Sequence, residues 1–135
     1  MPIDWIACKK RYEKELFNSV VPFWEKNCLD PKYGGYFTFL DRDGSVYDTN
    51  KFMWMQWRIV YTFATLATSD YSKKTESRKY RCNPDRWMKL SRQGFDFLVE
   101  HGKDENDQYY FALNQQGEPI VAPYNIYSQA FVVMG

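Results

Sequence analysis

The spacing of apolar residues predicts a helix followed by a β-hairpin at the start of the chain. Apolar residues recur at roughly helical intervals from Asp4 to Asn27, which predicts a helix over this range. Pro22 falls inside it and is expected to kink the helix or mark a restart, because proline removes a backbone donor. After the pair Gly34-Gly35, the β-prone run from Tyr36 to Tyr47 encloses an Asp-Gly turn and predicts a hairpin.

The next predicted helix covers residues 51–68 and is apolar on nearly every side. A helix of this kind is typically buried. Asp48, Thr49 and Asn50 precede it and offer side-chain oxygens to cap its first turn.

Residues 69–82 are predicted to form a basic surface insertion. Few of them are apolar, and five are basic: Lys73, Lys74, Arg78, Lys79 and Arg81. A further helix then begins with Asn83 as its N-cap and Pro84 in its first position, the position that proline favours. Gly102 is its predicted C-terminal stop.

The second half of the chain repeats this order of elements. Residues 36–44 (YFTFLDRDG) match residues 109–117 (YYFALNQQG) without a gap, 73 positions further on. The same offset aligns Gln56 with Gln129 and Trp54 with Tyr127. The unit is therefore a helix, a hairpin and a second, more buried helix, present almost twice.

The second unit stops at Gly135, within its inner helix. Repeated supersecondary units bury their faces against neighbouring units, and about three or more are usually needed for stability. We therefore expect residues 1–135 to be an incomplete single domain, the N-terminal part of a longer protein.

Composition and charge exclude several classes of protein. Aromatic residues make up 19% of the chain, which excludes a disordered protein and suits either a core or the lining of a wet pocket. A net charge of +1 gives no overall field to attract nucleic acid or an acidic membrane. The sequence has no apolar stretch of about 18 residues, and its first four residues, Met1 to Asp4, lack the charged and then apolar order expected of a signal peptide. Neither a nucleic acid nor a membrane is expected as a partner.

Cysteine and histidine usage gives no support for a metal site. Cys8, Cys28 and Cys82 are widely spaced, and we interpret them as reduced thiols of a cytoplasmic protein. The single histidine, His101, lies in the last turn of its predicted helix, where a cation suits the helix dipole. We favour that role over catalysis. No zinc-protease motif or glycine-rich phosphate loop is present, so no metal or cofactor is expected.

Arg58 is the main candidate for a binding residue. It follows Trp54 by one turn in an otherwise apolar segment, and a buried guanidinium is costly unless it is paired or faces a polar cavity. The two side chains offer a flat face for a sugar ring and a rigid fork for its oxygens. The alternative is an ion pair with a hairpin carboxylate, and the candidates are Asp41, Asp43 and Asp48. The sequence leaves both interpretations open.

Asp41 and Asp43 also have two possible roles. They resemble the paired carboxylates of a glycosidase, but they flank an Asp-Gly turn. Aspartate is common in such turns because its side chain bonds the nearby backbone, so we interpret both as turn formers.

Several ordered segments resemble the N-acylglucosamine 2-epimerase family, whose relatives include cellobiose 2-epimerases and aldose–ketose isomerases. These segments are VPFWE (21–25), GGYFTFLDRDGSVYDT (34–49), KFMWMQWR (51–58), HGKD (101–104), YYFAL (109–113) and PYNIYSQAF (123–131). They cover nearly the whole chain except the basic insertion, and they correspond to the N-terminal third of such a protein. The resemblance implies a mainly α fold, an (α/α)6 toroid with short β-hairpins between helices and a central sugar pocket.

The resemblance also implies an activity. Family members invert C2 of a reducing sugar, here most of all N-acetylglucosamine and N-acetylmannosamine, by proton abstraction and return through an enediolate-like intermediate. Arg58 matches the arginine that holds the oxygen where charge develops, and Trp54, Tyr127 and Gln129 are the expected pocket lining. Two histidines act as base and acid. Some members use ATP as an activator and many are dimers, so a homodimer is expected of the full-length protein.

Three features depart from the family pattern. Trp57 stands where a small residue or Asn is usual, and its bulk could shift Arg58 or narrow the pocket. The run Gln129-Ala130-Phe131 is closer to the disaccharide-epimerase and isomerase branch. The two catalytic histidines belong to later hairpins and His101 matches neither, so this chain alone is expected to be inactive. The alternatives are a non-catalytic toroid that binds a sugar or a protein, and an epimerase or isomerase acting on cellobiose or mannose.

Overall fold

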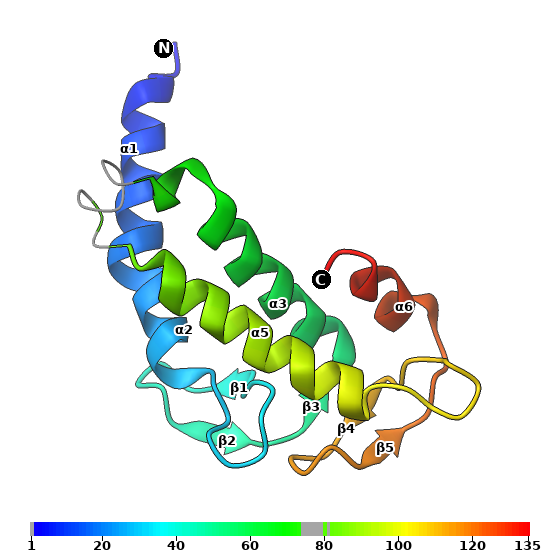
Figure 1. Ribbon diagram of the computed structural model, residues 1–135. Helices are drawn as coiled ribbons and strands as arrows, with labels where there is room; N and C mark the ends of the chain where they lie inside the picture. The colour runs from blue at the N-terminus through cyan, green and yellow to red at the C-terminus, as the bar shows by residue number, and fades with distance from the viewer. Residues whose placement is uncertain (1, 74–79, 81) are drawn as a thin grey trace.

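The first helical segment runs without a break along one side of the molecule. The computed structural model describes residues 2–73, 80 and 82–135 (Figure 1). Helix α1 (Trp5–Glu15) continues through a π-helical turn, η1 (Leu16–Val20), into α2 (Val21–Asn27), and the junction residues keep helical dihedrals. The predicted helix over residues 4–27 is confirmed as one continuous segment, and its α-helical part resumes at Val21 with Pro22 in the first turn of α2. Since proline lacks the N–H that would bond Asn18, we attribute the wider π-turn to this missing bond.

Helices α3 (Met53–Thr68) and α5 (Pro84–His101) lie side by side, and α6 (Ile126–Val132) packs against α3 (Figure 1). The predicted ends of α5 are confirmed. The Asn83 side chain accepts from the Arg86 N–H at 3.0 Å, and the Gly102 N–H donates to the Leu98 carbonyl at 2.9 Å. A short 3-10 helix, η2 (Asp70–Ser72), follows α3.

The five strands of the described residues gather at the end of the helices where α2 and α5 finish and α3 begins (Figure 1). The predicted first hairpin is confirmed, with strands β1 (Phe39–Leu40) and β2 (Val46–Asp48). A second antiparallel sheet, in the order β3-β4-β5, contains β3 (Lys51–Phe52), β4 (Ala112–Leu113) and β5 (Pro119–Val121). Strand β3 comes from the first unit and β4 and β5 come from the second, so this sheet joins the two units.

This sheet corrects the predicted start of α3. Lys51 and Phe52 pair with Leu113 and Ala112 in the sheet, so the helix begins two residues later than the apolar pattern predicts. The predicted capping is also wrong, because the N-cap is Phe52 and no side chain bonds the first turn. The Asp48 carboxylate instead accepts from the Asn50 N–H at 2.8 Å.

Corresponding elements recur in the two predicted units, since the 73-residue offset places α5 on the α1–α2 helical segment and α6 on the start of α3. Both hairpin turns place a glycine at positive φ, at 88° for Gly44 and 97° for Gly117. Each turn is closed by the glycine N–H, which donates to the carbonyl of Asp41 in the first unit and of Asn114 in the second. The matching turns show that the repeated sequence encodes a repeated backbone.

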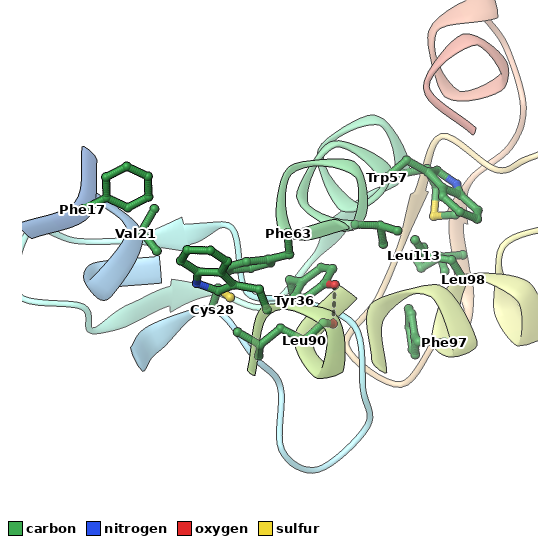
Figure 2. Packing of buried hydrophobic residues seen from close by; sticks show 13 residues of the cluster. Phe17, Val21, Cys28, Tyr36, Trp57, Phe63, Leu90, Phe97, Leu98 and Leu113 are labelled. Carbon is green, nitrogen blue, oxygen red and sulfur yellow. Dashed lines mark hydrogen bonds between the residues drawn. The ribbon is translucent and has the colours of Figure 1, made fainter. Parts of the chain in front are cut away.

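The core lies mainly between α3 and α5 and is extended by residues from α2 and the sheet (Figure 2). Tyr36 lies inside it and donates from its hydroxyl to the Leu90 carbonyl at 2.7 Å. Only one side of α3 is buried in this core. Arg58 and Tyr61 on other sides of α3 are exposed, so the prediction of a helix buried all round is wrong for the described residues.

The segment after α3 is anchored to α1 by tyrosines. Tyr71 and Tyr80 pack on the Phe17 ring, and their hydroxyls donate to the two carboxylate oxygens of Glu13, at 2.8 and 2.6 Å. Lys73 pairs with Asp70 at 2.6 Å. The remaining basic residues of the predicted insertion, Lys74, Arg78, Lys79 and Arg81, lie outside the described residues.

Candidate functional site

Helices α3 and α6 bring an arginine and aromatic side chains together. The Trp54 and Phe131 rings lie 6.2 Å apart between centroids, and their planes are inclined at 45°. The Arg58 guanidinium carbon lies 5.7 Å from the Trp54 centroid and 5.4 Å from the Phe131 centroid. A guanidinium over two aromatic faces is held by cation–π attraction while its N–H donors stay available.

Arg58 is exposed and makes no ion pair with Asp41, Asp43 or Asp48. The pairing alternative is therefore wrong. Two of these carboxylates serve the hairpin, as expected of turn formers: Asp41 accepts from the Arg42 N–H, and Asp43 accepts from the N–H and hydroxyl of Ser45. Among the described residues, no carboxylate neutralises the Arg58 charge, which leaves it able to bind an oxygen of a ligand.

Phe131 is a part of this cluster that the sequence analysis did not select. It lies one helical turn after Tyr127 on α6, and Tyr127 is 63% exposed. The only signal for Phe131 in the sequence was its place in the run that resembles the family. The roles of Trp54, Arg58 and Tyr127 in substrate binding stay predictions.

The Gln129 side chain makes a hydrogen bond within the fold. Its side-chain N–H donates to the Tyr109 carbonyl at 3.4 Å, as the Gln56 side chain does to the Tyr36 carbonyl at 2.8 Å. The offset of 20 residues is the same in both units. The contact ties α6 to its hairpin, and a role for Gln129 in the pocket stays a prediction.

Trp57 does not disturb the Arg58 side of α3. Its side chain is 2% exposed and meets the rings of Phe95 and Tyr109 edge-on, at 5.9 and 5.7 Å between centroids. The indole therefore fills the core between α3, α5 and the second hairpin (Figure 2).

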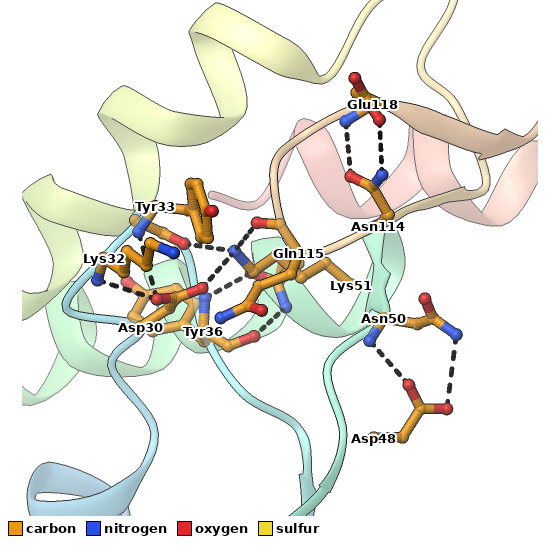
Figure 3. Close-up of polar contacts among 12 residues, drawn as sticks. Asp30, Lys32, Tyr33, Tyr36, Asp48, Asn50, Lys51, Asn114, Gln115 and Glu118 are labelled. Carbon is orange, nitrogen blue, oxygen red and sulfur yellow. Dashed lines mark hydrogen bonds and ion pairs between the residues drawn. The ribbon is translucent and has the colours of Figure 1, made fainter.

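A buried ion pair lies beneath the start of α3 (Figure 3). The Lys51 ammonium is 2.9 Å from a carboxylate oxygen of Asp30, and both side chains have no exposed surface. Burial lowers the pKa of Lys51, and the bond to Asp30 offsets part of this effect. Burial alone would raise the pKa of Asp30, but hydrogen bonds from Lys51, Lys32 N–H and Tyr33 N–H outweigh it, so this pKa is lowered.

The pairing of Lys51 with Asp30 was not predicted from the sequence. The predicted helix over residues 51–68 included Lys51, whereas Lys51 lies in β3 and is fully buried. The two residues are 21 positions apart, and neither belongs to a motif that marks a buried charge.

The histidine and the cysteines, which could in principle be reactive, lie in surroundings that give no support for catalysis. The His101 ring packs on Phe97 at 4.8 Å between centroids, in the last turn of α5 as predicted. Cys8 and Cys28 are free thiols, and burial raises the pKa of Cys28 to about 12, which makes it a poor nucleophile. In residues 2–73, 80 and 82–135, no three histidines, cysteines or carboxylates are grouped as a metal site would require. Within the same ranges, no helix combines the length and apolar character needed to span a membrane.

The known proteins that this chain resembles include sugar 2-epimerases. The family model for N-acylglucosamine 2-epimerase (GlcNAc 2-epimerase) matches residues 35–135. The N-acylglucosamine 2-epimerase of Mus musculus is 32% identical over 128 residues, which cover 93% of this chain and 28% of that protein. The cellobiose 2-epimerase of Dictyoglomus turgidum is 27% identical over 136 residues, which cover 98% of this chain and 31% of that protein. The chain thus spans less than a third of the length of these relatives.

Solved structures share its fold. A sugar epimerase from a ruminal bacterium superposes with a TM-score of 0.72 at 18% identity, over 92% of this chain and 29% of that one. The cellobiose 2-epimerase from Spirochaeta thermophila gives 0.70 at 19% identity, over 96% and 30%. The expected architecture is confirmed: these helix–hairpin–helix units are those of an (α/α)6 toroid. With residues 35–135 matched by the family model, the chain belongs to the N-acylglucosamine 2-epimerase family.

Proposed function

We propose that the protein carrying this chain interconverts C2 epimers of a reducing sugar, most of all N-acetylglucosamine and N-acetylmannosamine. The observation that carries the proposal is the exposed Arg58 guanidinium over the Trp54 and Phe131 rings, with no described carboxylate paired to it. Aromatic faces suit the apolar face of a sugar ring, and a guanidinium fork suits its oxygens.

The chemistry needs a cation near the sugar carbonyl oxygen. When a base removes the C2 proton, negative charge moves onto this oxygen and an enediolate forms. A fixed cation lowers the barrier because it stabilises this charge without having to reorganise. In this proposal, Arg58 supplies the cation, while Trp54, Phe131 and Tyr127 contact the sugar ring.

The proton steps need a base and an acid with pKa values near neutrality, and histidine is the usual choice. His101 packs on Phe97 and lies close to Gly117 in the second hairpin, and among the described residues no contact joins it to the Arg58 cluster. The two histidines that the family uses would have to come from outside residues 1–135. The chain by itself is therefore expected to lack turnover.

N-acylglucosamine is favoured over cellobiose by sequence similarity, since the mouse N-acylglucosamine 2-epimerase is 32% identical and the Dictyoglomus turgidum cellobiose 2-epimerase is 27% identical. An activity on cellobiose or mannose is the closest alternative.

The proposal is tested by proton exchange at C2. The complete gene product is incubated in deuterated water with N-acetylmannosamine, and in parallel with cellobiose and with mannose. We expect deuterium at C2 and formation of N-acetylglucosamine, seen by NMR. Exchange with cellobiose or mannose alone would move the activity to that branch, and absence of exchange with every sugar would contradict an epimerase.

A non-catalytic sugar-binding protein is the second candidate, because an exposed guanidinium over the Trp54 and Phe131 rings suits a bound sugar whether or not it is turned over. It predicts saturable quenching of tryptophan fluorescence by N-acetylmannosamine without any exchange at C2. We also infer a cytoplasmic location, supported by the free thiols of Cys8 and Cys28. Cell fractionation tests this location.

A further inference from the structure

The Lys51 ammonium donates to three acceptors, which is its full capacity (Figure 3). They are the Asp30 carboxylate at 2.9 Å, the Gly34 carbonyl at 2.6 Å and the Gln115 carbonyl at 2.7 Å. The Phe97 ring closes the site, with its centroid 4.3 Å from the nitrogen. No part of the Lys51 side chain reaches the surface.

The three acceptors belong to segments that are distant in sequence. Asp30 and Gly34 lie in the loop after α2, where the other Asp30 oxygen accepts from Lys32 N–H at 2.9 Å and Tyr33 N–H at 3.2 Å. Gln115 lies in the turn between β4 and β5 of the second unit. Lys51 itself is in β3, which pairs with β4. One ammonium thus joins the first loop, the strand before α3 and the second hairpin.

These segments lead directly into the candidate site. Helix α3 begins two residues after Lys51, and Trp54 and Arg58 lie on its first two turns. The β4–β5 hairpin leads into α6, which carries Tyr127 and Phe131. A shift of the second hairpin against β3 would therefore move Phe131 relative to Trp54 and Arg58.

We propose that Lys51 is a positioning residue for this site, since it fixes the starts of α3 and α6 relative to each other and so sets the Arg58–Trp54–Phe131 cluster. The inference rests on the proposed function. It also fits the energetics of buried ion pairs. Replacing such a pair with apolar residues of similar volume is often neutral for stability, so the pair is weak evidence for a purely stabilising role.

The test uses the complete gene product with the double substitution Asp30→Leu/Lys51→Met. It removes both charges, so no unpaired charge stays buried, but it also removes the bonds to Gly34 and Gln115. The single Lys51→Met variant leaves Asp30 uncompensated and reports on stability instead. Lys103→Met is the control. Lys103 lies in the loop after α5, which corresponds to the loop after α2 that holds Asp30, and it pairs with Asp107 at 3.1 Å on the surface.

Two readouts separate positioning from folding. The first is steady-state epimerisation, in which a misplaced arginine should lower kcat/KM about a hundredfold, chiefly through kcat. The second is the fluorine NMR resonance of Trp54 in protein labelled with 5-fluorotryptophan, assigned with Trp54→Phe. We expect this resonance to shift and broaden in the folded double variant and to be unchanged in Lys103→Met.

The second readout keeps the two proposals distinguishable. Absence of C2 exchange in the wild-type protein would contradict the epimerase, while the Trp54 resonance would still report on positioning. An unchanged resonance in the double variant would overturn the role of Lys51, as would an unchanged kcat/KM. Failure of the double variant to fold would also overturn it, because the pair would then serve the fold as a whole.

Discussion

The side-chain amide of Gln56 forms two hydrogen bonds with the backbone of Tyr36. Its Oε1 accepts from the Tyr36 N–H and its Nε2 donates to the Tyr36 carbonyl, both at 2.8 Å. Gln56 is fully buried on α3, and its amide satisfies both backbone groups of Tyr36, a residue that forms an isolated antiparallel bridge with Leu29. In the second unit, Gln129 makes one longer bond, of 3.4 Å, to Tyr109.

Gln56→Leu should therefore destabilise the protein far more than Gln129→Leu. The first substitution leaves two buried backbone groups of Tyr36 without partners, which costs about 3 kcal/mol in the free energy of unfolding. The second removes one long, partly buried bond, which costs about 0.5 kcal/mol. Urea denaturation of both variants measures the difference. Equal losses would mean that the two glutamines hold their hairpins equally well.

The repeat was the part of the fold that the sequence predicted best. The matched segments around Gly44 and Gly117 have a local physical cause, because each turn needs a residue at positive φ. The equivalence of Gln56 and Gln129 in the two units followed from the 73-residue offset alone. Its structural meaning did not, because glutamine is as suited to a sugar hydroxyl as to a backbone amide.

Most of the missed features depend on contacts between distant segments. Lys51 and Phe52 have helix-like surroundings in sequence, yet β4 draws them into a sheet across 60 residues. Asp30 has no local sign of its partner. The π-turn at Leu16–Val20 depends on how the helix adapts to Pro22, which periodicity alone does not report. At Lys51 and Asp30, tertiary structure decided between local alternatives that the sequence left close in energy, whereas the π-turn is a local adaptation of the helix to proline.

Gly94→Ala should destabilise the core. Gly94 lies on α5, and a Cβ there would overlap the hydroxyl and ring of Tyr36, which is itself fully buried. Overpacking of this kind costs about 2 kcal/mol, so the melting temperature should fall by several degrees. Gln93→Ala is the control. Gln93 precedes Gly94 on α5 and its side chain is exposed, so this substitution should change the free energy of unfolding by less than about 0.5 kcal/mol. A melting temperature for Gly94→Ala equal to that of the control would contradict the packing described for Tyr36.

Asp30 should contribute to the loss of stability in acid. Folding lowers the pKa of Asp30 below its ordinary value of 3.8. Its contribution to the free energy of unfolding is therefore complete well above pH 3.8 and is lost as the pH falls through the folded-state pKa. The difference in free energy of unfolding between wild type and Asp30→Asn should be largest near pH 7 and should shrink below pH 3.8. Asp96→Asn, at an exposed site on α5, should show a small difference at every pH. A wild-type advantage over Asp30→Asn that does not vary with pH would contradict this prediction.

Glu25 should behave in the opposite way. Burial raises its pKa above 4.5, although Trp87 and Arg86 oppose the effect, so its ionised form is disfavoured in the folded protein. The resulting cost is present at neutral pH and is relieved as the pH falls through the raised pKa toward 4.5. Glu25→Gln should therefore be more stable than wild type at pH 7, with an advantage that declines toward pH 4.5. Glu15→Gln on the exposed face of the same helical segment is the control. A gain in stability for both variants would point to overall charge in place of burial.

Arg58→Met should separate binding from folding. Because Arg58 is exposed and makes no described ion pair, its loss should change the free energy of unfolding by less than about 0.5 kcal/mol. If the guanidinium stabilises charge on the sugar oxygen, kcat/KM for epimerisation should fall by about 10²–10³ in the complete gene product. Arg92→Met, at an exposed position of α5, should leave both quantities unchanged. A large loss of stability in Arg58→Met would mean that the contacts with Trp54 and Phe131 hold α6 in place. A normal rate would remove Arg58 from the proposed mechanism, because no other cation lies over these two rings in the described structure.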